Sequence, residues 1–240
     1  MTVAVVTLCV LFGFNLLGLL ISIPLDRNGV PASMNGQTVK RRPGTLNQRL
    51  PLILFNLLVL CASAAPPLFL FSDLFSLEAP PLWVFCLQFG LLVFLDDLWF
   101  YIVHRVIHEN KTLYRVIHKK HHEAYAPVPI EYLYVHPLEW MAGGIGPAIA
   151  ILLIIGVAGG MSAWTLWVWG AWRIIHELDI HSGIAARLAR FVPFFAGTEH
   201  HDLHHARPTM GNYASSLTLW DRVFRTEIDL SKVKRARTGS

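Results

Sequence analysis

Long apolar segments constrain the fold of this chain more than any other feature. A spanning helix needs about 20 mostly apolar residues, and 54% of the 240 residues are hydrophobic while only 15% are charged. The segments of suitable length are Val3–Leu25, Leu50–Phe71, Leu82–Val103 and Pro137–Val157, followed by the shorter Met161–Ile175. Only residues 158–160 separate the last two, which predicts a tight helical hairpin. We expect one all-α polytopic membrane domain over residues 1–240, with about four transmembrane helices.

The charged residues between these segments predict an orientation. The first loop carries a single acid, Asp26, against five bases: Arg27, Lys40, Arg41, Arg42 and Arg49. Such an excess of bases is typical of a cytoplasmic loop. The next loop, residues 72–81, holds two acids and no base, so it belongs on the opposite side, and the third span returns to the cytoplasm near His104. Because the bases flank apolar segments, the net charge of +4 indicates no nucleic-acid partner.

The histidines are concentrated in one half of the chain. All twelve lie between His104 and His205, and eight form three clusters: His104/His108, His118/His121/His122 and His201/His204/His205. Neutral imidazole is a common ligand for late first-row metals. The pattern therefore predicts a metal centre, and the topology places it in a helical cap on the cytoplasmic membrane face.

The spacing within the clusters indicates more than one metal. Histidines four residues apart share one face of a helix, so one metal can bridge them. In the two clusters with spacing i, i+3 and i+4, two rings converge while the third points about 100° away, toward a second metal. Eight imidazoles exceed the four ligands of one tetrahedral zinc. A carboxylate-bridged di-iron bundle is excluded because no glutamate has a histidine three residues later.

The other four histidines are predicted individually. His181 follows two acids at the end of an apolar segment and is expected to bind metal. The sequence leaves open whether His176 is a metal ligand or a structural residue. His136 precedes Pro137 and is expected to start a helix rather than to bind metal, and His200 is expected to be a neighbour of the site.

Carboxylates beside the histidines are candidates for orienting the ligand rings or for binding metal themselves. We include Asp97 because a carboxylate in an apolar span must be paired or functional. The candidates are Asp97 or its neighbour Asp96, Glu123, Asp179, Glu199 and Asp202.

Residues 96–226 resemble the fatty acid hydroxylase and sterol desaturase superfamily of membrane di-iron oxygenases. The family's H-x-x-x-H motif appears at residues 104–108, and its H-x-x-H-H motif appears at 118–122 and again at 201–205. Residues 136–139 resemble the H-P-x-E element of sterol-acting members, and 181–183 resemble their H-S-G element, whose histidine is expected to bind metal. Asn212-Tyr213 and Trp220–Thr226 resemble the family's ending, except that Arg225 replaces a glycine, which puts a turn with positive φ in doubt.

The resemblance implies a lipid hydroxylase or monooxygenase with two irons, dioxygen as co-substrate and no catalytic side chain beyond the metal ligands. The implied ligands are His104, His108, His118, His121, His122, His181, His201, His204 and His205. Electrons would come from an external donor such as cytochrome b5 or ferredoxin with its NAD(P)H reductase. The chain lacks the His-Pro-Gly-Gly of a fused cytochrome b5 domain, which favours the sterol-acting branch.

Within the chain, we expect N-terminal spans over residues 1–95, the catalytic region over 96–226 and a basic tail over 227–240. The membrane would be the endoplasmic reticulum in a eukaryote or the inner membrane in a bacterium.

Three other functions stay open at this point. A desaturase would use the same ligands to remove two hydrogens from the lipid. A membrane metal transporter or metal-binding scaffold would also be rich in histidine, but would place its ligands near the middle of the membrane. A bis-imidazole haem protein needs one histidine on each of two facing helices and leaves the H-x-x-H-H tracts unexplained.

Overall fold

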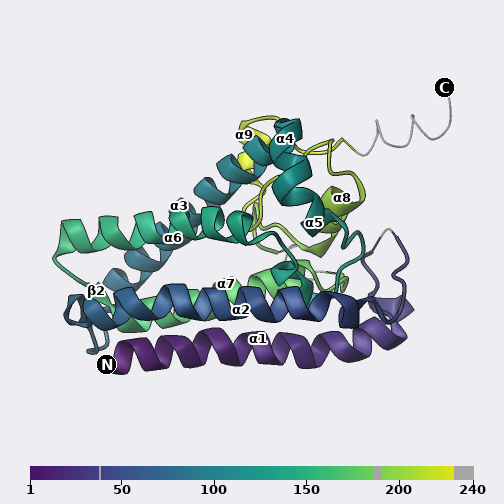
Figure 1. Cartoon of the computed structure of the whole chain (residues 1–240). Coiled ribbons are helices and arrows are strands. Elements are labelled where there is room, and N and C mark those ends of the chain that lie inside the picture. The colour runs from purple at the N-terminus through teal and green to yellow at the C-terminus, as the bar shows by residue number, and fades with distance from the viewer. Residues whose placement is uncertain (38, 186–190, 230–240) are drawn as a thin grey trace.

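Five long helices dominate the computed structural model, which describes residues 1–37, 39–185 and 191–229 (Figure 1). They are α1 (Thr2–Asn28), α2 (Thr45–Leu70), α3 (Leu82–Glu109), α6 (Pro137–Ala158) and α7 (Ala163–Ile180). Among the described residues, α1, α2, α3 and α6 are long and apolar enough to cross a membrane. The prediction of an all-α protein with about four spans is confirmed.

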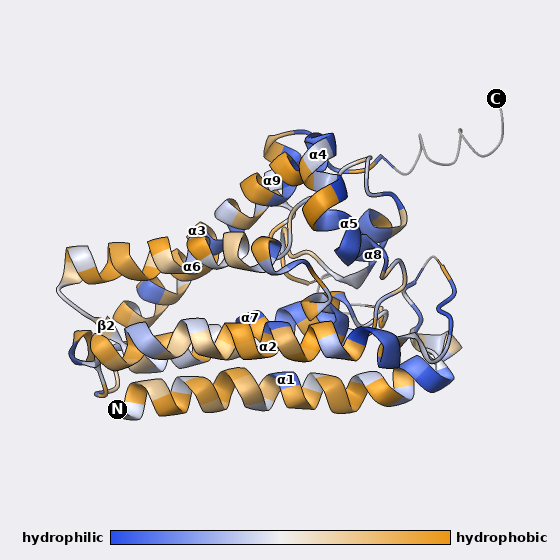
Figure 2. Ribbon diagram, in the orientation of Figure 1, coloured by the Kyte–Doolittle hydropathy of each residue, from blue (hydrophilic) through white to orange (hydrophobic). Residues whose placement is uncertain are grey.

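The remaining elements are short and lie mostly at one end of the long helices (Figure 1). They are η1 (Ala32–Met34), η2 (Ser72–Leu74), β1 (Phe75–Ser76), α4 (Lys111–Leu113), the π-helical η3 (Tyr114–His118), α5 (Lys119–His122), η4 (Pro129–Leu133), β2 (Met161–Ser162), α8 (Thr198–Ala206) and α9 (Leu219–Val223). The two strands pair in parallel, with Phe75 opposite Met161 and Ser76 opposite Ser162. Hydrophilic residues gather around α5 and α8, whereas the long helices are largely apolar (Figure 2).

The long helices pack in two sets, with α2 and α7 against α1, and α6 against α3. The turn after α6 is tight, as predicted, with Gly159 at φ 74°. The predicted hairpin is nevertheless wrong in its packing, because α6 and α7 diverge from this turn toward different partners (Figure 1). A glycine allows α6 to pack closely against α3. A Cβ on Gly146 would lie 2.9 Å from the Cβ of Trp99, so only glycine lets the two helices approach this closely.

Helix α6 buries only one narrow stripe. Gly146, Ala150 and Ile154 are its buried residues, four apart and therefore on one face. Large apolar residues elsewhere on the helix stay uncovered; Leu152 is 68% exposed and Val157 is 83% exposed. A helix in water would hide such residues, so this surface suits contact with lipid.

A buried network of ion pairs ties the first loop to the histidine-bearing end of the molecule. Arg41 pairs with Asp26 at the end of α1 and with Glu131 of η4, both at 2.6 Å, and Arg49 pairs with Glu131 at 2.8 Å. Arg49 also donates to the carbonyl of Glu123, directly after α5. Two of the five bases that indicate a cytoplasmic loop therefore also have a structural role. The loop lies at the same end as the histidine clusters, as the topology argument requires.

The turn in doubt at Arg225 is formed despite the missing glycine. Arg225 has φ 57°, in the left-handed region that favours glycine. The amide of the next residue, Thr226, donates to the carbonyl of Asp221 at 2.7 Å and holds the turn in place. The surrounding contacts thus impose a conformation that costs a non-glycine residue about 1 kcal/mol.

We predict that Arg225→Gly stabilises the protein by about 0.5–1 kcal/mol, because glycine adopts this φ without strain. Arg225→Ala is the matched control, since alanine removes the exposed side chain but keeps the strain. The free energy of unfolding in mixed micelles, measured by denaturant titration, should rise only for the glycine variant. An equal rise for both variants would show that the side chain, and not the backbone, carries the strain.

Candidate metal centre

Five histidines form a first group in which every candidate ligand nitrogen lies within 4.8 Å of the others. They are His104, His108, His118, His122 and His204. The Nε2 atoms of four of them make a closed ring: 3.1 Å from His104 to His118, 3.0 Å from His118 to His122, 3.2 Å from His122 to His108 and 3.2 Å from His108 to His104. The ring of nitrogens is compact enough to surround a single ion.

Four further histidines form a second, fully buried group: His121, His181, His201 and His205. The Nε2 atoms of His201 and His181 are 3.0 Å apart, and those of His205 and His201 are 3.1 Å apart. The two groups adjoin, because the His122 and His205 rings lie 4.8 Å apart between centroids. The structure thus brings together all nine residues predicted as ligands.

Helical spacing assigns the residues to the two groups. His104 and His108 are four apart on α3 and enter the first group together. His118 and His122 are also four apart and join the same group, while His121 points to the second. On α8 the assignment is reversed, since His201 and His205 enter the second group and His204 the first. Each H-x-x-H-H tract therefore contributes to both groups.

The hydrogen bonds on the far side of the rings determine which nitrogen faces the centre. His104 Nδ1 lies 2.7 Å from the carbonyl oxygen of Tyr213, and His118 Nδ1 lies 2.8 Å from a carboxylate oxygen of Glu139. The carbonyl of Tyr213 only accepts, so His104 Nδ1 must donate its proton and its Nε2 is left with a bare lone pair. His204 Nδ1 donates likewise to the carbonyl of Gly211 at 2.8 Å, and His181 Nδ1 to that of Glu177 at 2.8 Å. His118 Nδ1 makes no hydrogen bond to Glu139 despite the short distance.

This arrangement fits a metal cation. The Nε2 atoms around the ring are 3.0–3.2 Å apart. His104 and His204 both present Nε2 lone pairs to this group, so neither nitrogen can donate to the other. The buried Nε2 of His204 has no hydrogen-bond partner among the described residues. Two ligands at right angles, each about 2.1 Å from a metal, would lie about 3.0 Å apart, which matches the observed spacing.

Burial keeps the ligand imidazoles in the form that binds metal. Removal from water is the main cause that lowers the pKa of His118 to about 3, and it lowers the pKa of His181 as well. The pKa values of His121, His122, His201, His204 and His205 are also well below 6.5, first through burial and then through the neighbouring rings. Neutral imidazole is the metal ligand, so no proton must leave before binding.

Asp221 organises the segment that supports the first group. Its carboxylate accepts from the backbone amides of Tyr213 at 2.9 Å and Ala214 at 3.0 Å, and from the hydroxyl of Thr226 at 2.7 Å. A Cβ on Gly211 would collide with the carbonyl oxygen of Thr226, so this position requires glycine. The segment is thereby held so that the carbonyls of Gly211 and Tyr213 face two ligand rings.

The other three histidines lie outside both groups. His136 caps α6, where its Nδ1 accepts from the amide of Leu138, the role expected for it. His176 bonds to the carbonyl of Ser215 at 3.0 Å and stacks on Trp172. These contacts favour a structural role for His176. His200, adjacent to a ligand, lies 3.3 Å from a carboxylate oxygen of Asp221.

Two of the carboxylates expected beside the ligands, Asp97 and Glu123, form their hydrogen bonds elsewhere. Asp97 instead accepts from the backbone amides of Ser216 at 2.7 Å and Leu217 at 3.1 Å. Glu123 bonds to Tyr134 and Lys120 near the surface. Asp179 is half-buried, Glu199 is exposed, and Asp202 is buried on α8. The carboxylate at a ligand is Glu139, which the sequence singles out only as part of the H-P-x-E element.

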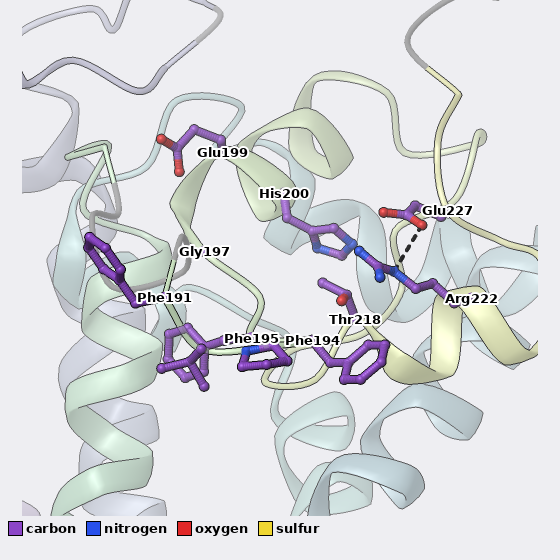
Figure 3. Close-up of a pocket in the computed structure, with 11 residues that line it drawn as sticks. Phe191, Phe194, Phe195, Gly197, Glu199, His200, Thr218, Arg222 and Glu227 are labelled. Carbon is purple, nitrogen blue, oxygen red and sulfur yellow. Dashed lines mark ion pairs between the residues drawn. The ribbon is translucent and has the colours of Figure 1, made fainter.

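Two cavities lie in this region. The smaller one, about 50 Å³, lies against both groups and is lined by ligands, aromatic rings and three charged residues, Glu139, Arg173 and Glu177. The larger one, about 470 Å³, contains none of the nine ligands (Figure 3). Phe191, Phe194 and Phe195 line it with His200, and an ion pair between Arg222 and Glu227 lies at its edge. Of the two, the smaller cavity would place a substrate next to the nine candidate ligands.

The pKa values predict how stability depends on pH. Without metal, the folded protein keeps His118 neutral down to about pH 3, whereas the unfolded chain takes up its proton near pH 6.5. Stability should therefore fall as the pH drops below about 6.5, by up to about 1.4 kcal/mol per pH unit for each such histidine. Denaturant titrations of metal-free protein between about pH 7.5 and pH 5 would measure this. His118→Gln should flatten the slope by about one proton, and a wild-type profile without slope would contradict the assignment.

The chain matches known proteins over the region that carries the site. The family model of the fatty acid hydroxylases matches residues 89–226. Methylsterol monooxygenase 1 from Rattus norvegicus is 38% identical over 184 residues, covering 73% of this chain and 60% of that protein. A methylsterol monooxygenase from Aspergillus fumigatus is 37% identical, covering 68% of this chain and 55% of that protein. A C-4 methylsterol oxidase from Schizosaccharomyces pombe is 32% identical, covering 69% and 62%.

The chain thus spans between half and two thirds of the length of these relatives. No solved structure matches it. The family match covers more than half of the chain and includes all nine histidines of the two groups. The chain belongs to the fatty acid hydroxylase family.

Proposed function

We propose that this chain is a membrane monooxygenase that uses two irons, dioxygen and external electrons to oxidise a C–H bond of a methylsterol. The observation that carries the proposal is the convergence of nine imidazoles, seven of them buried and two partly buried, in two adjacent groups beside a small cavity. Two groups of nitrogen ligands suit a pair of late first-row metals, and the family match supports iron.

The names of the relatives support the substrate class. Three similar proteins are named for oxidation of methylsterols, one of them at C-4. A sterol dissolves in the membrane, and the apolar outer surface of the long helices lies in the same phase (Figure 2). A methyl group on a sterol ring could then reach the cavity without crossing water.

The residues of the chain would hold the metals, orient the ligand rings and exclude water from the site. The first metal would be held by the group around His104 and the second by the group around His181, with their rings fixed by the Nδ1 hydrogen bonds. Bound iron would supply dioxygen activation and cleavage of the C–H bond. Phe100, Tyr132 and Trp140 line the cavity and would keep water from the reacting carbon. No side chain is needed as a general base.

The proposal includes a cytoplasmic location for the site and an external redox partner. The basic loop lies at the histidine-bearing end, which supports the cytoplasmic face. Electrons would come from a donor such as cytochrome b5 or ferredoxin with its NAD(P)H reductase. The membrane would be the endoplasmic reticulum in a eukaryote and the inner membrane in a bacterium.

A metal transporter is less well supported by the geometry. Its ligands would follow a path through the middle of the helix bundle, whereas these histidines lie at the C-terminal ends of α3 and α7 and in short elements near them. A desaturase would use the same ligands, so product analysis must separate it from an oxygenase.

We predict that the purified protein converts a C-4 methylsterol, with a reductase and its electron donor, into products that carry oxygen from ¹⁸O₂. His204→Ala and His201→Ala each remove one ligand, from the first and the second group respectively, and each should lower turnover at least about a hundredfold. Mass spectrometry of the extracted sterols measures both the rate and the label.

His136→Ala is the matched control, because His136 lies outside both groups. It should retain turnover within a few-fold of wild type. Unlabelled olefin as the product would favour the desaturase, and full turnover by His204→Ala would contradict the ligand assignment.

A further inference from the structure

An arginine lies in the wall of the cavity that the ligands share. Arg173, on α7, lines it together with His104, His118, His121, His181 and His201. The side chain is only 17% exposed. Charged residues within an apolar helix bundle are costly and usually serve function, so its presence beside the metal site needs an explanation.

The hydrogen bonds of Arg173 are incomplete. Its Nε donates to the Oδ2 of Asp96 on α3 at 2.6 Å, and its Nη atoms make no hydrogen bond to any other described residue. A guanidinium has five N–H donors. The partner is incomplete too, since the Oδ1 of Asp96 is buried without a hydrogen-bond partner among the described residues. The pair thus offers both spare donors and a spare acceptor.

In a purely structural ion pair, two nitrogens of the guanidinium would be expected to bond to the two oxygens of the carboxylate. Arginine and carboxylate commonly join through two parallel hydrogen bonds, and Arg41 of this chain shows how completely a buried arginine can be satisfied. It makes five hydrogen bonds, to Asp26, Glu131 and the carbonyl of Ala126. The single bond between Arg173 and Asp96, at the edge of a cavity, contrasts with that arrangement.

We propose that Arg173, held by Asp96, binds the hydroxyl group of the sterol and so positions the neighbouring methyl group at the metal site. This inference rests on the proposed function. A hydroxyl oxygen accepts from such spare donors, and Arg173, the donor of the pair, lines the cavity. In a C-4 methylsterol the carbon that bears the hydroxyl is bonded directly to the carbon that bears the methyl group. A donor inside the small cavity therefore lies where this substrate needs it.

This role also explains why a charged side chain, Arg173, is present in an apolar region. A buried donor that is left without an acceptor destabilises the complex. A sterol hydroxyl would satisfy it, while a hydrocarbon of the same shape would leave it unsatisfied. The site should therefore discriminate strongly between the two, with Arg173 as a specificity-determining residue.

The test is binding in the absence of turnover. Full-length protein in nanodiscs, without reductant, is titrated with radiolabelled 4,4-dimethylcholestanol and with 4,4-dimethylcholestane, which lacks the hydroxyl. Wild type should bind the alcohol at least about tenfold more tightly, because a hydrogen bond to a charged group contributes about 1.5–3 kcal/mol. The double variant Asp96→Asn with Arg173→Met removes both charges of the pair, and it should lose this preference.

Arg222→Met is the matched control, because this arginine lines the larger cavity instead. It should keep the wild-type preference. Metal content, measured on every sample, reports whether a variant has folded with its site intact. Arg173→Lys, which keeps the charge, should retain part of the preference and serves if the double variant does not fold.

The outcomes separate the two proposals. If wild type oxidises the methylsterol but the double variant still prefers the alcohol, the role of Arg173 is wrong and the proposed function stands. If wild type neither binds nor oxidises a methylsterol, both the proposed function and the role of Arg173 are wrong. Equal binding of both ligands by wild type would also overturn the role of Arg173.

Discussion

The mutual repulsion of unprotonated imidazole nitrogens is the constraint on which the rest of this structure depends. Backbone carbonyls hold the Nδ1 protons of His104 and His204, so the Nε2 lone pairs of both rings face the first group. Buried lone pairs that face one another are unfavourable without a cation between them. Metal binding would thus contribute to folding, and the segments that carry the carbonyls must be fixed before the site is complete.

The segment after α8 shows how much of the chain serves this purpose. Asp221 holds the amides of residues 213 and 214, and the glycine at 211 is required by the close approach of Thr226. The strained φ of Arg225 belongs to the same turn. Strain at one residue is tolerated because the neighbouring hydrogen bonds hold two metal-facing carbonyls in place.

Buried charges have two different uses at the histidine-bearing end. The network of Asp26, Arg41, Arg49 and Glu131 is closely paired and joins the first loop to η4. The pair of Arg173 and Asp96 keeps unused donors and acceptors beside the cavity. A satisfied network stabilises one conformation, whereas an incomplete pair leaves room for a ligand.

The spans, the nine histidines and their division into two groups were predictable from sequence, because helical spacing alone determines which rings share a face. The helix start at His136 was also predictable, because the following Pro137 suits the first position of a helix. The orienting partners were not, since His104, His181 and His204 are oriented by backbone carbonyls, which every residue carries. The divergence of α6 from α7 was also missed, because it depends on the close contact between Gly146 and Trp99.

Acidic residues close in sequence were a poor guide to those close in space. Asp97 lies near the ligands on α3 but accepts hydrogen bonds from the amides of residues 216 and 217. Glu139, on the different helix α6, lies close to His118. A pairing across helices leaves no periodic signal in either segment. Arg173 was missed for the same reason, because its partner Asp96 lies 77 residues away.

Metal analysis of the purified protein tests the central claim most directly. After expression with ample iron, elemental analysis by plasma mass spectrometry should find about two irons per chain, because each group of imidazoles would bind one. His201→Ala and His204→Ala should each lower that number, whereas His136→Ala should not. One iron or none per wild-type chain, or an unchanged content in both ligand variants, would contradict the account.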